Sequence, residues 1–280
     1  MNGAVGFGVF SAEGGSARVG FRVGHGVLDL AASGLGPVFE TSSLNGFLGL
    51  GRSAWEDALG RVAELVEAGA EVVPLEHTTV HLPFEVADYV DFYSSLEHAS
   101  NLGRLFRPDA DPLLPNWRHL PVGYHGRAGT VVVSGTPVVR PCGQMRGPED
   151  ATPRFGPSAR LDLELELGFV VGVGSDQGES VPGAAFRDHV FGVVLVNDWS
   201  ARDIQAWEYQ PLGPFLGKSF ATSISAWITP LALLDDSLVA GPEQDPEPLP
   251  YLRVPGDWAL DAELEVEIGD TVVSRTNARG

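Results

Sequence analysis

The chain has 280 residues, of which 44% are hydrophobic and 20% are charged, so it is long enough to bury one large core or two smaller ones and disorder is not expected. Eighteen basic residues against thirty-seven acidic ones give a net charge of -19, which makes nucleic acid and anionic membrane surfaces poor partners. A single cysteine excludes an internal disulfide, no apolar run approaches the roughly 20 residues that span a bilayer, and the N-terminus has no leader pattern. We therefore expect a cytoplasmic protein.

The N-terminal part is predicted to contain short strands and one clear helix. Ser53 and Glu56 have the spacing of a capping box, four apolar residues recur on one helical face, and Gly69 follows as a stop. A proline-containing extended stretch comes next, and we place a domain boundary near residue 83. The predicted strands are residues 4–10, 17–23 and 26–31, and the helix face comprises Trp55, Leu59, Val62 and Val66.

The stretch DFYSSLEHASNLGRLFRP, residues 91–108, combines charged and aromatic side chains with enough apolar ones to dock on a core. Ser94 and Glu97 again have capping-box spacing, so a helix is predicted to begin near Ser95 and to carry His98 on one side. Such a helix is either a solvated surface element or one wall of a site. The helical pattern alone does not decide between the two.

From residue 120 onward the pattern is mainly β, with glycine and proline turns between the strands and one short helix. Together with the N-terminal strands, this predicts a β-rich fold with many turns. The predicted strands lie within residues 129–139, 161–173, 189–198, 226–231 and 259–273, and the helix lies within residues 199–209.

In the sequence LDLELEL, leucines alternate with Asp162, Glu164 and Glu166, and strand periodicity places these carboxylates on one face about 7 Å apart. Anions this close repel unless they are solvated or share a cation. The segment is therefore either a metal site or an amphipathic strand with one wet face. Because residues 261–267 repeat the alternation, spacing alone does not identify the metal site.

Three further positions are candidates for chemistry. Asp198 ends an apolar run long enough for a buried strand, where a rigid scaffold would hold it, although it could equally cap the next helix. Lys218 lies in a Gly/Pro-rich loop that allows close approach of a ligand, but loop lysines are more often solvated. His98 is either a structural histidine or a base tuned by a neighbouring carboxylate such as Glu97.

Five long blocks of the sequence carry a resemblance to a known family: DFYSSLEHASNLGRLFR, LLPNWRHLPVGYHGRAGTVVVSGTPV, LDLELELGFVVG, VNDWSARDIQAWEYQPLGPFLGKSF and QDPEPLPYL. Taken together, they resemble the fumarylacetoacetase family, whose members hydrolyse 4-fumarylacetoacetate to fumarate and acetoacetate in the last step of tyrosine degradation. The resemblance implies a mainly β fold with short helices. A small N-terminal SH3-like β-barrel, residues 1–83, would precede a catalytic mixed β-sandwich roll, residues 84–280, in a homodimer.

The resemblance also implies a divalent-metal site made of carboxylate oxygens, which suit a hard cation such as Ca²⁺ or Mg²⁺. A second Mg²⁺ position would involve Lys218, Thr222 and Asp198. Ala221 stands where the family pattern has glycine, which puts that second position in question. The implied ligands of the main site are Asp91, Glu164, Glu166 and Asp198.

The same resemblance assigns the base and the substrate contacts. His98 would deprotonate a water molecule that attacks the diketo acid, and Arg107 would pair with a substrate carboxylate. Donors aimed at the developing oxyanion would lower the barrier to carbon–carbon cleavage. These donors would be Arg202, Gln205 and Lys218, and the substrate contacts would be Tyr93, Arg107, Gln205 and Tyr209.

Two alternatives remain open at this point. One is a related lyase, such as a decarboxylase of an oxo-acid, although the sequences DFYSS and NDWSARDIQ favour the hydrolase. The other is a metal-binding fragment without activity, because family members continue beyond the sequence TVVSRTNARG that ends this chain. In the family, the later part carries the acid that orients the catalytic histidine. We therefore expect an open metal site and little hydrolase activity from residues 1–280.

Overall fold

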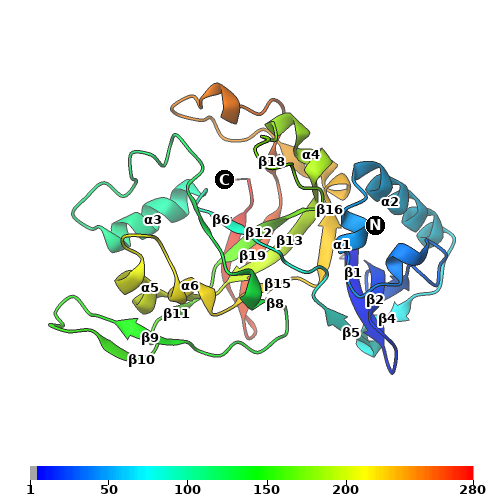
Figure 1. Ribbon diagram of the computed structural model, residues 1–280, viewed down its shortest axis with the longest axis horizontal. Coiled ribbons are helices and arrows are strands. Elements are labelled where there is room, and N and C mark those ends of the chain that lie inside the picture. Colours follow the sequence, from blue (N-terminus) through cyan, green and yellow to red (C-terminus); the bar gives the residue numbers. More distant parts are fainter. Residues whose placement is uncertain (1–4, 280) are drawn as a thin grey trace.

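The structure, a computed structural model, describes residues 5–279 and is mainly β with few helices, as the sequence predicts. Within that range a ten-stranded sheet forms the centre of the molecule, and shorter strand pairs and helices surround it (Figure 1). The strands of this sheet are β1 (Val5–Ala12), β2 (Arg18–Val23), β3 (Gly26–Asp29), β4 (Val73–Pro74), β5 (Thr78–His81), β8 (Val131–Val133), β12 (Leu165–Val171), β13 (Val190–Asp198), β15 (Thr222–Ile224) and β16 (Trp227–Pro230).

The remaining strands form separate antiparallel pairs, in which each strand bonds to one partner. None of the helices within residues 5–279 has the length and apolar character needed to cross a membrane. The strand pairs are β6 (Val90–Phe92) with β7 (Gly123–His125), β9 (Cys142–Met145) with β10 (Arg154–Pro157), β11 (Leu161–Asp162) with β14 (Ser200–Ala201), β17 (Leu238–Val239) with β18 (Ala259–Leu260), and β19 (Glu263–Ile268) with β20 (Thr271–Asn277). The α-helices are α1 (Asn45–Leu48), α2 (Arg52–Glu67), α3 (Leu96–Phe106), α4 (Phe186–His189), α5 (Arg202–Glu208) and α6 (Leu216–Ser219).

Helix α2 begins two residues earlier than the predicted capping box requires. Its N-cap is Gly51, which has a φ of 83° and no side-chain cap, so Ser53 lies inside the helix and the predicted cap is wrong. A left-handed glycine makes the sharp entry that a capping serine was expected to make. The predicted stop is confirmed, because Gly69 has a φ of 73° and its amide donates to the Val66 carbonyl at 3.1 Å.

One sheet and one hydrophobic core extend across residue 83. Strand β1 pairs with β16, where Phe7 lies opposite Ile228, and the two strands run side by side in Figure 1. The Phe7 ring lies 4.9 Å from the Phe21 ring and 5.5 Å from the Phe191 ring, centroid to centroid. The strands approach so closely that a Cβ at Gly6 would come within 2.5 Å of the Ile228 carbonyl oxygen. The two predicted domains therefore pack on shared apolar side chains.

Strand β13 connects this core to the opposite side of the molecule. It pairs with β12, β15 and β16, so its backbone is fixed on both edges. Its first residues lie in the core, and its last residue, Asp198, lies at the far end beside β15. Helices α3, α5 and α6 gather on that side, away from the N-terminal strands (Figure 1).

Replacing Phe7 by alanine tests the shared core. Because the Phe7 side chain is fully buried between the two halves, we expect a loss of about 3–5 kcal/mol in the free energy of unfolding, measured by chemical denaturation. Leu212→Ala is the control, because Leu212 is 95% exposed and its removal should change that free energy by less than about 0.5 kcal/mol. Equal effects of the two substitutions would contradict the shared core.

Candidate active site

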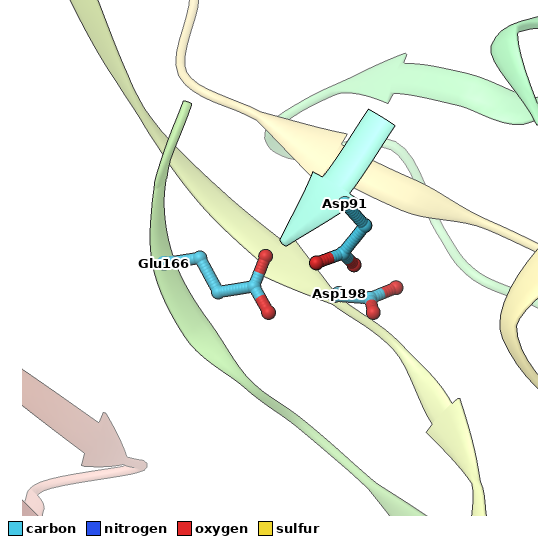
Figure 2. Close-up of side chains that lie close together, drawn as sticks. All are labelled: Asp91, Glu166 and Asp198. Carbon is cyan, nitrogen blue, oxygen red and sulfur yellow. The ribbon is translucent and has the colours of Figure 1, made fainter. Parts of the chain in front are cut away.

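Three carboxylates from distant parts of the sequence converge beside the end of β13. Asp91 comes from β6, Glu166 from β12 and Asp198 from the end of β13, and they point toward one another in Figure 2. One oxygen of each lies within 4.8 Å of the others. Asp198 is buried and the other two are half-buried. This arrangement brings three of the four predicted metal ligands to one point.

The close approach of these anions changes their acidity. Burial raises the pKa of Glu166 to about 9, and the charges of Asp91, Asp198 and Glu164 add to this effect. Burial likewise raises the pKa of Asp198 to about 7, although the ammonium group of Lys218 opposes the change. The site therefore favours protons or a cation over a cluster of free carboxylates.

The side chains fit a hard divalent cation. Two donors, Lys218 and Tyr124, contact Oδ2 of Asp198, whereas its Oδ1 is buried and has no hydrogen-bond partner among residues 5–279. A buried acceptor without a donor is costly, and a cation would satisfy it. The set contains only oxygen ligands, as Mg²⁺ and Ca²⁺ prefer.

Glu164, the fourth predicted ligand, faces positive side chains instead. Its Oε1 accepts from Nη2 of Arg202 at 2.6 Å and lies 3.2 Å from Nε2 of His98, while its Oε2 accepts from Lys218. Burial alone would raise the pKa of Glu164, but the hydrogen bond with His98 and the charges of Lys218 and Arg202 lower it overall. Glu164 is thus a stable carboxylate that holds these three groups.

The predicted regular strand through Asp162, Glu164 and Glu166 is wrong. The chain leaves β11 after Asp162 and enters β12 at Leu165, because β11 pairs with β14 whereas β12 pairs with β13. Asp162 is exposed and accepts from Nε of Arg202 at 2.9 Å. The three acidic side chains consequently enter three different environments.

Helix α3 places His98 beside Glu164. Ser95 caps this helix, since its hydroxyl accepts from the His98 amide at 3.3 Å, so the predicted start is confirmed but the predicted Ser94 cap is wrong. The carboxylate beside the His98 ring is Glu164 rather than its chain neighbour Glu97. The Tyr93 ring packs edge-on against His98, with ring centroids 5.8 Å apart.

Helices α5 and α6 hold the basic and amide groups. Helix α5 starts after Ala201, which rules out the alternative that Asp198 is its cap. Nη1 of Arg202 donates to Oε1 of Gln205 at 3.1 Å, and Nη2 of the same guanidinium donates to Oε1 of Glu164. A Cβ at Gly217 would lie 2.8 Å from the backbone nitrogen of Gln205, so only glycine allows this close contact between α5 and α6.

Lys218 is buried between Glu164 and Asp198. Burial alone would lower its pKa, but the two carboxylates raise it overall, so its amine stays protonated. An ammonium group has no lone pair, so Nζ cannot be a metal ligand in this state. Thr222, also buried, lies opposite Asp198 in the β13–β15 pair, and its hydroxyl is 3.2 Å from that of Tyr89.

The predicted substrate contacts occupy the elements around this cluster. The Tyr93 hydroxyl donates to the Ala99 carbonyl at 3.0 Å. Arg107 follows helix α3, and its Nη2 donates to the Pro112 carbonyl at 2.7 Å, while its buried Nε has no hydrogen-bond partner in the described part of the chain. The Tyr209 ring stacks on the Phe106 ring, with centroids 5.5 Å apart.

The sequence analysis missed one residue of this cluster. Tyr124 lies on β7, directly opposite Asp91, and its hydroxyl donates to Oδ2 of Asp91 at 2.8 Å. The same hydroxyl is 3.2 Å from Oδ2 of Asp198. Burial, together with the charges of Asp198 and Asp91, raises the pKa of Tyr124 far above its usual range, so the phenol is neutral. Only the β6–β7 pairing reveals this contact.

Comparison with known proteins agrees with this geometry. Two protein-family models match the chain: "Fumarylacetoacetase N-terminal" over residues 5–83 and "Fumarylacetoacetate (FAA) hydrolase C-terminal" over residues 88–279. The chain is 47% identical to the fumarylacetoacetase of Rattus norvegicus, over 94% of this chain and 68% of the relative. The chain belongs to the fumarylacetoacetase family. Family membership makes it a metal-dependent hydrolase, and Asp91, Glu166 and Asp198 form the acidic group in which a metal can bind.

Other fumarylacetoacetases and solved structures extend the comparison. The Homo sapiens enzyme is 45% identical over 94% of this chain and 68% of its own. The fumarylacetoacetate hydrolase of Exiguobacterium antarcticum has a TM-score of 0.53 at 16% identity and covers 98% of this chain and 76% of its own. The maleylpyruvate hydrolase of Sphingobium sp. SYK-6 has a TM-score of 0.55 at 14% identity, and the match covers 98% of this chain and 77% of its own. At such low identity, the last two show a shared fold alone.

Glu166→Gln should stabilise the metal-free protein while removing its metal site. Because the folded-state pKa of Glu166 is about 9 and the ordinary value is 4.5, the folded state keeps a proton that the unfolded state loses between these values. The free energy of unfolding therefore falls as pH rises through this window. At pH 8 in chelator, we expect the variant to unfold at least about 3 °C above the wild type.

The gain should vanish near pH 4, and Mg²⁺ or Ca²⁺ should no longer stabilise the variant. Glu263→Gln, on the exposed part of β19, is the control and should leave both properties unchanged. A Glu166→Gln protein that is less stable at pH 8 than the metal-free wild type would contradict the repulsive cluster.

Proposed function

We propose that this chain hydrolyses the carbon–carbon bond of 4-fumarylacetoacetate to fumarate and acetoacetate, using a Mg²⁺ or Ca²⁺ ion held by Asp91, Glu166 and Asp198. The observation that carries the proposal is the convergence of these carboxylates in a chain 47% identical to a fumarylacetoacetase. When bound, the cation would supply Lewis-acid polarisation of the diketone oxygens and fix their orientation. Glu164 remains a predicted ligand, and its present contacts support a role as counter-charge to the neighbouring cations.

His98 is the proposed base. An ionised carboxylate such as Glu164 only accepts hydrogen bonds, so the facing Nε2 of the neutral ring would carry the proton. Nδ1 is then free to take a proton from a water molecule. Glu164 would thereby supply the orientation for which the family resemblance implies a later acid.

Arg202, Gln205 and Lys218 are the proposed donors to the oxyanion. Arg202 has five N–H groups and uses three on Asp162, Glu164 and Gln205. Lys218 has three N–H groups and uses two of them, on Glu164 and Asp198. Because Oε1 of Gln205 accepts from Arg202, the side-chain nitrogen Nε2 of Gln205 is available as a donor. Each of the three groups thus retains hydrogens for negative charge that develops on the substrate.

The chemical sequence follows from these roles. Water loses a proton to His98 and its oxygen adds to the carbonyl that becomes the fumarate carboxyl group. The tetrahedral intermediate collapses, the carbon–carbon bond breaks, and its electron pair leaves with the acetoacetate carbanion. That carbanion takes up a proton, so the net change is the addition of one water molecule.

Arg107 is the proposed anchor for a substrate carboxylate. Its guanidinium has a backbone carbonyl as partner and a buried Nε without one, so an anion would complete its hydrogen bonds. Tyr93, Gln205 and Tyr209 are the other proposed substrate contacts. Phe106 supports Tyr209 by ring stacking.

We also propose a division into an SH3-like barrel, residues 1–83, and a catalytic β-roll, residues 84–280. The family boundaries at residues 83 and 88 support the division, and the shared core implies that the two parts fold against each other. A cytoplasmic homodimer is proposed from the family resemblance.

Turnover and its metal dependence test the function. With 4-fumarylacetoacetate, we expect the absorbance of the enolised diketone to decay, chelation to stop the decay, and Mg²⁺ or Ca²⁺ to restore it. Decay that survives complete chelation would contradict the proposed site. Metal binding without turnover would favour the non-catalytic alternative, and release of CO₂ from an oxo-acid would favour the decarboxylase.

Two substitutions on α3 and its C-cap should affect different kinetic constants. His98→Ala removes the base and should lower kcat about a hundredfold or more. Arg107→Ala removes an anchor used in the ground state as well as the transition state, so it should mainly raise KM. Steady-state kinetics at saturating metal separate the two effects.

Arg104→Ala is the matched control for Arg107, because Arg104 lies on the same helix, is exposed and contacts Asn101. It should leave both constants within about twofold. An unchanged kcat in His98→Ala would overturn the assignment of the base.

A further inference from the structure

Tyr124 and Asp91 occupy directly opposite positions in the β6–β7 pair. Side chains of opposed residues in an antiparallel pair project from the same face, so the pairing itself brings the phenol to the carboxylate. The hydroxyl donates to Oδ2 of Asp91 at 2.8 Å and lies 3.2 Å from Oδ2 of Asp198. Tyr124 therefore links two carboxylates of the proposed metal site.

The contact leaves the second oxygen of each carboxylate free of hydrogen bonds. Within residues 5–279, Tyr124 is the only side chain that donates a hydrogen bond to the Asp91 carboxylate. Oδ2 of Asp198 accepts hydrogen bonds from Tyr124 and Lys218, whereas Oδ1 is buried and has no partner among the residues that the structure describes. A carboxylate held through one oxygen presents the other in a fixed direction.

A neutral donor suits this position better than a charged one. A phenolic O–H group supplies a hydrogen bond without adding a positive charge that would repel a cation. Lys218 contacts Asp198 but not Asp91. The orientation of Asp91 thus depends on the phenol.

We propose that Tyr124 is a positioning residue for the metal site, whose hydroxyl orients the carboxylates of Asp91 and Asp198 so that their remaining oxygens face the cation. The inference rests on the metal site of the proposed function and adds a residue that neither the sequence motifs nor the acidic cluster identify. Partners that orient metal ligands typically contribute about 10- to 100-fold in metal affinity.

The test is metal affinity in Tyr124→Phe, measured by calorimetry with Mg²⁺, Ca²⁺ or Mn²⁺ alone and no substrate. Phenylalanine keeps the ring and removes only the donor, and thermal unfolding in chelator checks that the variant is folded. We expect the metal affinity to fall about 10- to 100-fold. Tyr251→Phe, at an exposed tyrosine, is the control for loss of a phenolic hydroxyl and should bind metal as the wild type does.

A double-mutant cycle with Asp91→Asn gives a second measurement. If the hydroxyl acts through Asp91, its removal should cost much less affinity in the Asp91→Asn background than in the wild type. Additive effects, or a Tyr124→Phe protein with wild-type metal affinity, would overturn the inference while leaving the metal site intact. A wild-type protein that binds none of the three ions would instead overturn the metal site of the proposed function.

Discussion

The crowding of four carboxylates, one buried and three half-buried, beside the end of one strand is the constraint on which the site depends. Glu164 and Asp198 share the ammonium group of Lys218, and Glu164 also receives Arg202. Asp91 and Glu166 have no basic side chain within 4.0 Å in the described part of the chain. The cluster therefore has a neutralised half, Glu164 and Asp198 with their basic partners, and an anionic half, Asp91 and Glu166. Protons or a divalent cation must complete the anionic half, which is why the site is suited to a metal.

The scaffold can hold this unfavourable arrangement because its centre is rigid. Strand β13 has hydrogen-bonded neighbours along both edges, and its other end is buried among aromatic side chains, including Phe191. Asp198 is therefore placed by the large sheet rather than by a loop. A site built on such an element keeps its geometry while its charges repel. The contact at Gly217 similarly fixes Lys218 relative to Gln205.

The local charge of the site differs from that of the whole chain. A net charge of -19 would repel an anionic small molecule, yet Arg202 and Lys218 contact the carboxylates of the site directly. Because these basic side chains lie within hydrogen-bonding distance of the carboxylates, the electrostatic field in the site is set by nearby charges rather than by the net charge of the chain. An acidic protein can thus bind an acidic substrate, provided that a cation also occupies the anionic half.

The sequence by itself determined the family, the β-rich architecture, the end of α2 at Gly69 and the start of α3 near Ser95, because these follow from long motifs and from local backbone preferences. It did not separate the two acidic strands by pattern, since both alternate with a period of two. Only the tertiary structure placed Glu166 against Asp91 and Asp198, Glu164 against Lys218, and the Glu265 of β19 on an exposed hairpin beside Arg275. It alone revealed Tyr124, because the environment of a carboxylate is set by side chains from other segments, and their approach depends on strand pairing rather than on local sequence.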